Sequence, residues 1–151
     1  AERLELFDGA FVVDSFARFS KVLILAAAAA ALILSFDYFE RAKIMKFEIP
    51  VVVLLSVAGM FMMVSANDLI SLYLGLELQS LSLYVLAAYQ RDNVRSTEAG
   101  VKYFVLGALA SGLLLYGSSL VYGFGGTTNF EGLATALRAG EIHVGVTIGI
   151  V

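Results

Sequence analysis

Long apolar runs separated by short polar breaks dominate the chain, and each complete run is long enough to cross a bilayer. The runs cover about 16–39, 49–66, 69–89 and 98–124, and a further one covers 142–151. A membrane-spanning helix needs roughly 20 apolar residues at a rise of about 1.5 Å per residue. The pattern therefore predicts an all-α, polytopic transmembrane helix bundle with four full spans and the start of a fifth, without a separate soluble domain.

Strands are not expected, because the apolar runs do not alternate and are far longer than barrel strands of about 9–11 residues. The segment 1–19 mixes polar and apolar residues and lacks the basic and apolar regions of a signal peptide. A short amphipathic helix is predicted at 130–137. The first residue is not Met and Val151 lies inside an apolar run, so both ends are expected to be cut.

Capping residues predict where the spans begin and end. Ser96 is a candidate N-cap for the fourth span, which places Glu98 in a first turn where negative charge favours the helix dipole. Asn67 and Asp68 are predicted to form a minimal turn between the second and third spans. The glycines at 125 and 126 are expected to end the fourth span.

Charged side chains suggest how the spans are oriented. The break at 40–48 carries Arg41, Lys43 and Lys46, the break at 90–97 carries Arg91 and Arg95, and the opposite loops carry little positive charge. Two spans separate the two basic breaks, so both lie on one side. Because basic residues concentrate in cytoplasmic loops, this side is predicted to be cytoplasmic.

Composition supports a membrane protein and excludes several other classes. The chain is 60% hydrophobic and 15% charged, with a mean hydropathy of +0.86, whereas soluble domains average about 45–50% and 25%. A net charge of −3 without basic blocks argues against a nucleic-acid partner. The absence of cysteine excludes disulfides, thiolate zinc sites and cysteine-ligated clusters in this chain.

Glu77 is the most informative residue, because it lies near the middle of the third span. Its distance from either end of the run is about 12–18 Å, too far for a short side chain to reach the headgroups. A charged residue at the bilayer centre costs at least about 2.5–3.5 kcal/mol on insertion scales, and such residues face protein or water. Glu77 is therefore a candidate for an ion path, with a protonated structural carboxyl as the alternative.

Helical projection places polar or small residues on two opposite faces of the third span. Tyr73, Ser80 and Tyr84 fall within about 60° of Glu77, while the other face carries Ser71, Gly75, Gln79 and Ser82. Small and polar residues mark helix–helix contacts in membranes. Protein is therefore expected on both sides of this span.

The fourth span has a charged face and a face of small residues. Glu98 and Lys102 are i,i+4 neighbours in the favourable order, and both are candidates for proton translocation. The alternatives are dipole complementation for Glu98 and snorkelling to the boundary for Lys102. The other face, suited to close helix contact, carries Gly100, Gly107, Ser111 and Ser118. A depth difference of about 10 Å makes direct contact between Glu77 and Lys102 unexpected.

The residues 67–122 resemble the antiporter-like N subunit of respiratory complex I, which is NADH dehydrogenase subunit 2 in mitochondrial naming. The matching text is NDLISLYLGLELQSLSLYVLAAYQ followed by RSTEAGVKYFVLGALASGLLLYGSSLVYG, and FVVDSFARF before the first span also resembles this family. The related L and M subunits place Trp before the glutamate. Leu76 precedes Glu77 here, which fits the N type.

The resemblance implies that the spans are helices three to six of a larger antiporter-like subunit of about fourteen. Glu77 then matches an intramembrane glutamate that modulates a lysine on a later helix, and Glu98 and Lys102 match charged positions opening the sixth helix. The resemblance also implies that this chain is a proton-translocating subunit of a translocase. Its expected partners are other complex I membrane subunits and the lipid bilayer, and its only expected substrates are protons and water. NAD, FMN, iron–sulfur clusters and quinone are expected in other subunits, and no metal site here.

The resemblance places the chain in a bacterial inner membrane or a mitochondrial inner membrane. Two other functions stay open on the sequence alone. One is a subunit of a related cation/proton antiporter or membrane-bound hydrogenase, which shares the glutamate and the lysine. The other is a purely structural membrane subunit whose buried charges satisfy one another.

Overall fold

Four long helices make up most of the computed structural model, which describes residues 3–44, 46–139 and 144–151. They are α1 (Ser15–Arg41), α2 (Glu48–Ser65), α3 (Leu69–Ala87) and α4 (Val94–Gly125). Each is long and apolar enough to cross a membrane. The predicted transmembrane helix bundle is confirmed, and the four predicted spans correspond to α1–α4.

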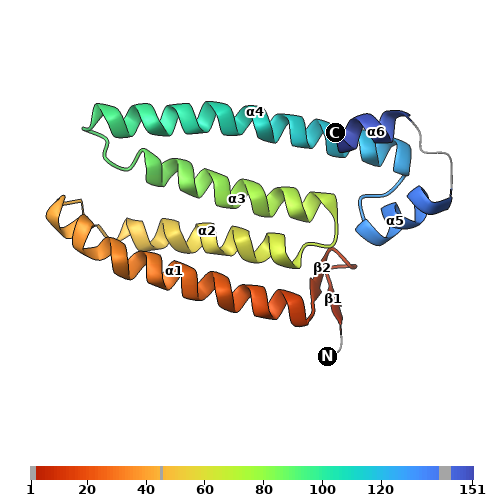
Figure 1. Cartoon of the computed structure of the whole chain (residues 1–151), viewed down its shortest axis with the longest axis horizontal. Helices are drawn as coiled ribbons and strands as arrows, with labels where there is room; N and C mark the ends of the chain where they lie inside the picture. The colour runs from red at the N-terminus through yellow and green to blue at the C-terminus, as the bar shows by residue number, and fades with distance from the viewer. Residues whose placement is uncertain (1–2, 45, 140–143) are drawn as a thin grey trace.

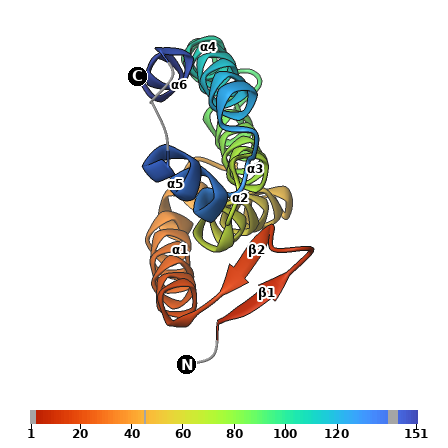
Figure 2. The ribbon, with the colours of Figure 1, turned by 90° about the vertical axis from the view of Figure 1, so that its right-hand side faces the viewer.

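The four helices lie side by side in chain order, each antiparallel to the one before (Figure 1). The main contacts join consecutive helices, and a short helix, α6 (Val144–Ile150), packs on α4 near its end. The view along the bundle in Figure 2 shows α5 (Phe130–Ala139) crossing the end of the bundle where α3 begins. The amphipathic helix predicted at 130–137 is thus present, and the first residues of the predicted fifth span, 142–143, lie outside the described residues.

A short hairpin precedes α1, which corrects the expectation that the chain forms no strands. β1 (Leu4–Leu6) pairs antiparallel with β2 (Phe11–Val13), with Leu4 opposite Val13. The connecting residues Phe7, Asp8 and Gly9 all have positive φ. Glycine adopts this conformation freely and aspartate tolerates it, so Asp-Gly between apolar stretches favours a tight reversal.

Asn67 holds the hairpin, the α2–α3 turn and α5 together at one end of the bundle. It is only 8% exposed. Its side-chain amide donates to Gly9 O at 2.9 Å, its backbone N–H donates to Ala10 O at 2.9 Å, and its carbonyl accepts from Phe130 N at 3.1 Å. The predicted turn at Asn67 and Asp68 is correct. Asp68 also caps α3 by accepting a hydrogen bond from Ser71 N at 2.6 Å.

The start of α4 differs from the prediction. Asn93, not Ser96, is the N-cap, because its Oδ1 accepts from Arg95 N at 3.0 Å and from Ser96 N at 3.4 Å. The helix therefore begins at Val94, and Glu98 lies beyond the first turn, where the helix dipole favours it less. Ser96 instead donates to Ala87 O at 2.7 Å, which fixes the start of α4 against the end of α3.

Candidate functional site

Glu77 lies near the middle of α3, eight residues after Leu69 and ten before Ala87. At the helical rise, these separations are about 12 Å and 15 Å. Its side chain is half-buried and lies on the α4 side of the helix. The carboxylate is therefore held at depth by protein, as its position in the sequence predicted.

A hydroxyl from the next helix holds the carboxylate. Ser111 of α4 donates a hydrogen bond to Glu77 Oε1, and Tyr73 Oη lies 2.9 Å from Ser111 Oγ. Tyr73 is on α3, one turn before Glu77, so the three side chains form a chain of hydrogen bonds across the α3–α4 contact. The sequence placed Tyr73 on the face of Glu77 and Ser111 on a small-residue face, but it did not identify Ser111 as the partner.

The two polar faces of α3 meet two different helices, as predicted. Ser71, Gly75 and Ser82 are buried on one face, and Gly75 contacts the backbone of α2. Glu77 on the other face contacts α4. The small-residue face of α4 meets α3 in turn, because Gly100 lies against Ala88, Gly107 against Tyr84 and Ser111 against Glu77.

An aromatic cluster lies between Glu77 and the end of the bundle that carries the basic loops. The ring of Tyr84 is edge-on to Tyr103 at a centroid distance of 4.7 Å and to Phe104 at 5.7 Å. Gly107 leaves room for the hydroxyl end of Tyr84, since a side chain there would overlap it. Aromatic rings thus line the α3–α4 contact on this side of Glu77, with Tyr103 and Phe104 about half exposed.

A groove lies on the other side of Glu77, toward the end where α3 begins. Its volume is about 420 Å³, and its lining carries several hydroxyls among apolar side chains. The lining residues are Leu69, Ile70, Tyr73, Leu115, Ser118, Ser119, Tyr122 and Thr128. Tyr73 belongs both to this groove and to the hydrogen-bonded chain that ends at Glu77.

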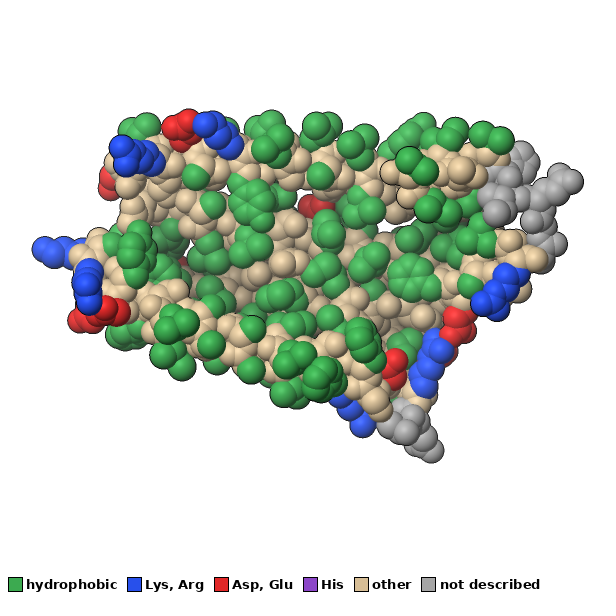
Figure 3. All heavy atoms as spheres, in the orientation of Figure 1, with side chains coloured by type: hydrophobic (Ala, Val, Ile, Leu, Met, Phe, Trp, Pro, Cys, Tyr) green, Lys and Arg blue, Asp and Glu red, His purple; other side chains and the backbone are tan. Residues whose placement is uncertain are grey.

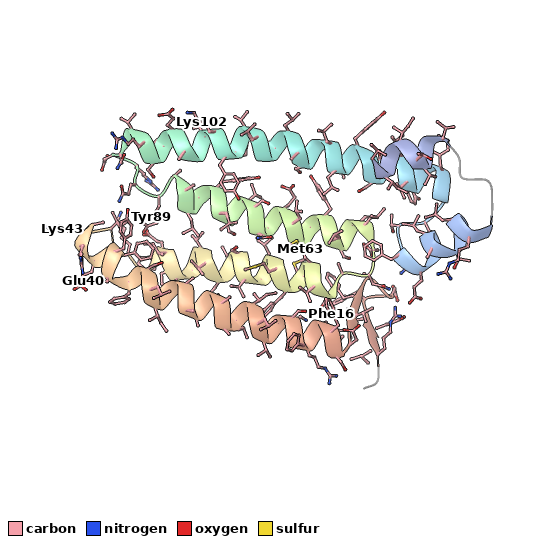
Figure 4. The ribbon with its side chains drawn as sticks, in the orientation of Figure 1. Phe16, Glu40, Lys43, Met63, Tyr89 and Lys102 are labelled. Atoms are coloured by element: carbon pink, nitrogen blue, oxygen red, sulfur yellow. The ribbon has the colours of Figure 1, made fainter. Side chains whose placement is uncertain are left out.

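Glu98 and Lys102 form their own ion pair away from Glu77. Lys102 Nζ lies 2.5 Å from Glu98 Oε1, and both side chains are exposed. Figure 4 shows Lys102 on the face of α4 that points away from α3. The structure therefore brings these two candidates together and, as the depth estimate predicted, does not join Lys102 to Glu77.

Charged side chains gather mainly near the ends of the helices, and apolar side chains cover their length (Figure 3). At the basic-loop end, Tyr89 donates to Glu48 Oε2 at 3.0 Å. Desolvation, the hydrogen bond and the charge of Glu48 raise the pKa of Tyr89 above its ordinary value of 10.0, while Arg91 opposes the shift. Within the described part of the chain, no group of three or more metal-ligating side chains could hold an ion.

A comparison with known protein families identifies the family of this chain. The family described as NADH:quinone oxidoreductase/Mrp antiporter, transmembrane, matches residues 66–151, which include α3, α4 and the site around Glu77. The chain belongs to this family. Like other members of the NADH:quinone oxidoreductase/Mrp antiporter family, it is an integral membrane protein, in agreement with its four apolar helices.

Its similar relatives carry one printed name, NADH-quinone oxidoreductase subunit N. The protein of Paramagnetospirillum magneticum is 62% identical, over 99% of this chain and 32% of its own length. That of Rhodobacter capsulatus is 59% identical, over 96% of this chain and 30% of its own length. The chain thus spans about a third of the relatives it matches.

Two solved structures share the fold of this family member. A chain of respiratory complex I from Thermus thermophilus matches with a TM-score of 0.69 and 28% identity, over 99% of this chain and 32% of that one. A chain of the membrane-bound sulfane sulfur reductase, an archaeal respiratory membrane complex, matches with a TM-score of 0.60 and 34% identity. This second match covers 66% of this chain and 20% of that one.

Proposed function

We propose that this chain is part of the N subunit of a proton-translocating NADH:quinone oxidoreductase, and that Glu77 carries or controls a proton within it. Relatives that match 96–99% of the chain, among them the two described above, are named as this subunit. The observation that carries the role of Glu77 is its carboxylate at mid-depth in α3, held by Ser111 of the neighbouring helix. Ionisable groups at such depth mark proton and ion pathways in membrane proteins.

The physical role would follow from electrostatic coupling inside a membrane, where the dielectric is low. A carboxylate held near a buried ammonium favours the charged form of that ammonium, and moving or neutralising the carboxylate favours proton release. We place the partner ammonium on a lysine of a later helix, beyond Val151. Energy would arrive from quinone reduction in other subunits through conformational and electrostatic coupling.

Glu98 and Lys102 enter the proposal as a second charged element near the membrane boundary. α4 has 32 residues and is about 48 Å long, longer than a hydrocarbon core of about 30 Å. Centred on that core, the helix would place Lys102 only a few ångströms inside it. Helices outside this chain would cover the pair and connect it to the path, and a local ion pair at the boundary is the competing role.

The proposal also assigns partners and cofactors. Other membrane subunits of the complex and the lipid bilayer would surround the exposed apolar faces, in a bacterial inner membrane or a mitochondrial one. NAD, FMN, iron–sulfur clusters and quinone would bind other subunits. In this view the chain performs no redox chemistry and exchanges only protons and water.

The decisive experiment is Glu77→Gln in the whole complex, with proton pumping and coupled quinone reductase activity measured in sealed vesicles. We expect assembly to survive and coupled turnover to fall about tenfold or more, since a positioned proton-transfer group contributes roughly 10²–10⁴-fold to its step. Glu131→Gln is the matched control, because it makes the same chemical change at an exposed side chain of α5, which pairs with Arg3 at the end of the bundle. Full coupled activity in an assembled Glu77→Gln complex would exclude this role.

A cation/proton antiporter subunit is the second candidate, because the description of the matching family includes Mrp antiporters. Purification of the native assembly separates the two. A complex that oxidises NADH and reduces quinone supports the first proposal, whereas an assembly that exchanges cations for protons without redox activity supports the second.

A further inference from the structure

We infer that Tyr73 and Ser111 form a hydroxyl relay that carries protons between Glu77 and the groove at the end of the bundle opposite the basic loops. This inference rests on the proposed role of Glu77 in proton translocation. It adds a route and two residues with defined roles. Three observations support it: the hydrogen-bonded chain, the groove that Tyr73 lines, and the aromatic cluster on the other side of Glu77.

The hydrogen-bonded chain has a defined direction when Glu77 is ionised. A serine hydroxyl has a single hydrogen, and a carboxylate can only accept. Ser111 therefore donates to Glu77 Oε1 and must accept the hydrogen of Tyr73 across their 2.9 Å contact. Every donor in the chain then points toward Glu77, which is the arrangement that proton uptake by the carboxylate requires.

The groove provides the outer end of the relay. Its volume of about 420 Å³ is many times the space that one water molecule needs, roughly 10–15 Å³ on the same type of measure. Tyr73, Ser118, Ser119, Tyr122 and Thr128 supply the polar partners that water requires. Tyr73 therefore connects a space fit for water to a carboxylate at mid-depth.

The aromatic cluster disfavours a proton path along the α3–α4 contact in the opposite direction, from Glu77 toward the basic loops. Tyr84, Tyr103 and Phe104 pack edge to face, and Gly107 brings the backbone of α4 against the end of Tyr84. This packing leaves less room for a file of water on that side of Glu77 than the groove offers on the other side. Along the α3–α4 contact, exchange is therefore directed to the groove.

The transfer is balanced over the three groups. A hydronium ion in the groove gives a proton to Tyr73 Oη and becomes water, Tyr73 passes its own hydroxyl proton to Ser111 Oγ, and Ser111 passes its proton to Glu77 Oε1. Each hydroxyl ends with one hydrogen, pointing the other way, and Glu77 becomes neutral. Release from Glu77 is the reverse sequence, and neither direction needs a further reactant.

The first test removes and restores the hydroxyls in the whole complex. We expect Ser111→Ala and Tyr73→Phe each to lower proton pumping and coupled turnover about tenfold while assembly survives. Ser111→Thr, which keeps a hydroxyl, should restore most of the activity. Ser82→Ala is the matched control, because Ser82 is buried on the α2 side of α3 and donates to Leu78 O of its own helix.

The results of Glu77→Gln separate the relay from the proposed function. A loss in Glu77→Gln together with wild-type coupling in Ser111→Ala and Tyr73→Phe would overturn the relay and leave the role of Glu77 intact. Wild-type coupling in Glu77→Gln would overturn both. Equal losses in Ser111→Ala and Ser111→Thr at normal assembly would also overturn the relay, because packing rather than the hydroxyl would then matter.

The second test determines which side the groove faces. This chain has no cysteine, so Ser118→Cys can be labelled with a charged, membrane-impermeant methanethiosulfonate in a complex whose other reactive cysteines have been replaced. We expect labelling only from the side opposite the basic loops, and none at Ser82→Cys. Labelling of Ser118→Cys from the basic-loop side, or from neither side, would overturn the route.

Discussion

The two faces of α3 meet their neighbours in different ways. On the α2 face, the backbones touch: a Cβ added at Gly59 would lie 2.5 Å from Gln79 N and 2.7 Å from Gly75 O. On the α4 face, side chains separate the helices in the middle of the contact, with Tyr84 against Gly107 and the hydroxyl of Ser111 against Glu77, and the backbone of Gly100 lies close to Ala88 at the end of α3. Glycine therefore allows close backbone contact on the α2 face of α3, whereas the α4 face leaves space for polar groups and a groove.

This difference assigns separate tasks to the two contacts. Close backbone approach through small residues is a principal source of helix association in membranes, where lipid competes equally for apolar side chains. The α2–α3 contact can therefore anchor α3. The α4 face is then free to hold a carboxylate and its hydroxyl partners without carrying the whole stability of the bundle.

The largest effect is expected from Gly59→Ala, which tests the anchoring contact. The added methyl would meet backbone atoms, which cannot move aside as the end of a side chain can. Overpacking costs about 1–3 kcal/mol, and with backbone as the obstacle we expect the upper part of this range. The amount of assembled complex on native gels after mild heating measures the effect.

Gly123→Ala is the control for this prediction, because a Cβ there would meet nothing within 4 Å. Alanine is favoured over glycine by about 0.5–1 kcal/mol in a helix, so this variant should be neutral or slightly more stable. If the two variants assemble equally well, the close α2–α3 contact is not what anchors α3.

A smaller effect is expected from Gly107→Ala, the corresponding change on the α4 face. Here the added methyl would overlap the hydroxyl end of Tyr84, which can be displaced by a change in the χ1 angle of that side chain. We expect a cost of about 1 kcal/mol, near the lower end for overpacking, and a displaced aromatic cluster. The amount of assembled complex, measured for both variants under the same conditions, ranks the two contacts. A greater loss of assembly in Gly107→Ala than in Gly59→Ala would show that the α4 face, not the α2 face, anchors α3.

Much of the bundle could be predicted because apolar length alone defines a membrane span. α1, α2 and α3 begin within one residue of the predicted starts at 16, 49 and 69. The start of α4 was placed too late, since Ser96 and Asn93 are both good caps and only the tertiary bond from Ser96 to Ala87 O decides between them. The hairpin was missed although Asp8-Gly9 between two apolar stretches is a signal for it.

The candidate site was predictable in part. Mid-depth position and helical periodicity were enough to locate Glu77 and its neighbour Tyr73. The partner Ser111 could also have been found, because Glu77 lies 13 residues before position 90 and Ser111 lies 14 after position 97, at matching depth in an antiparallel pair. The aromatic cluster and the groove could not, since they depend on side-chain rotamers and on how far apart α3 and α4 lie.

The smallest effect is expected from Tyr89→Phe, which removes a bond between the start of α2 and the loop after α3. Tyr89 lies at the basic-loop end of the bundle (Figure 4), and a surface hydrogen bond contributes little beside the glycine contact. Because its pKa is raised above 10.0, the folded state favours the neutral hydroxyl. The stabilisation that the Tyr89 hydrogen bond contributes is therefore complete below about pH 10 and is lost as the pH rises through the raised pKa.

Assembly measured over an alkaline series should show wild type slightly more stable than Tyr89→Phe at neutral pH, and this difference should disappear above the raised pKa of Tyr89. A difference that grows with pH would contradict this assignment, and a large difference at neutral pH would show that polar bonds at the helix ends contribute as much as the close backbone contact within the bundle.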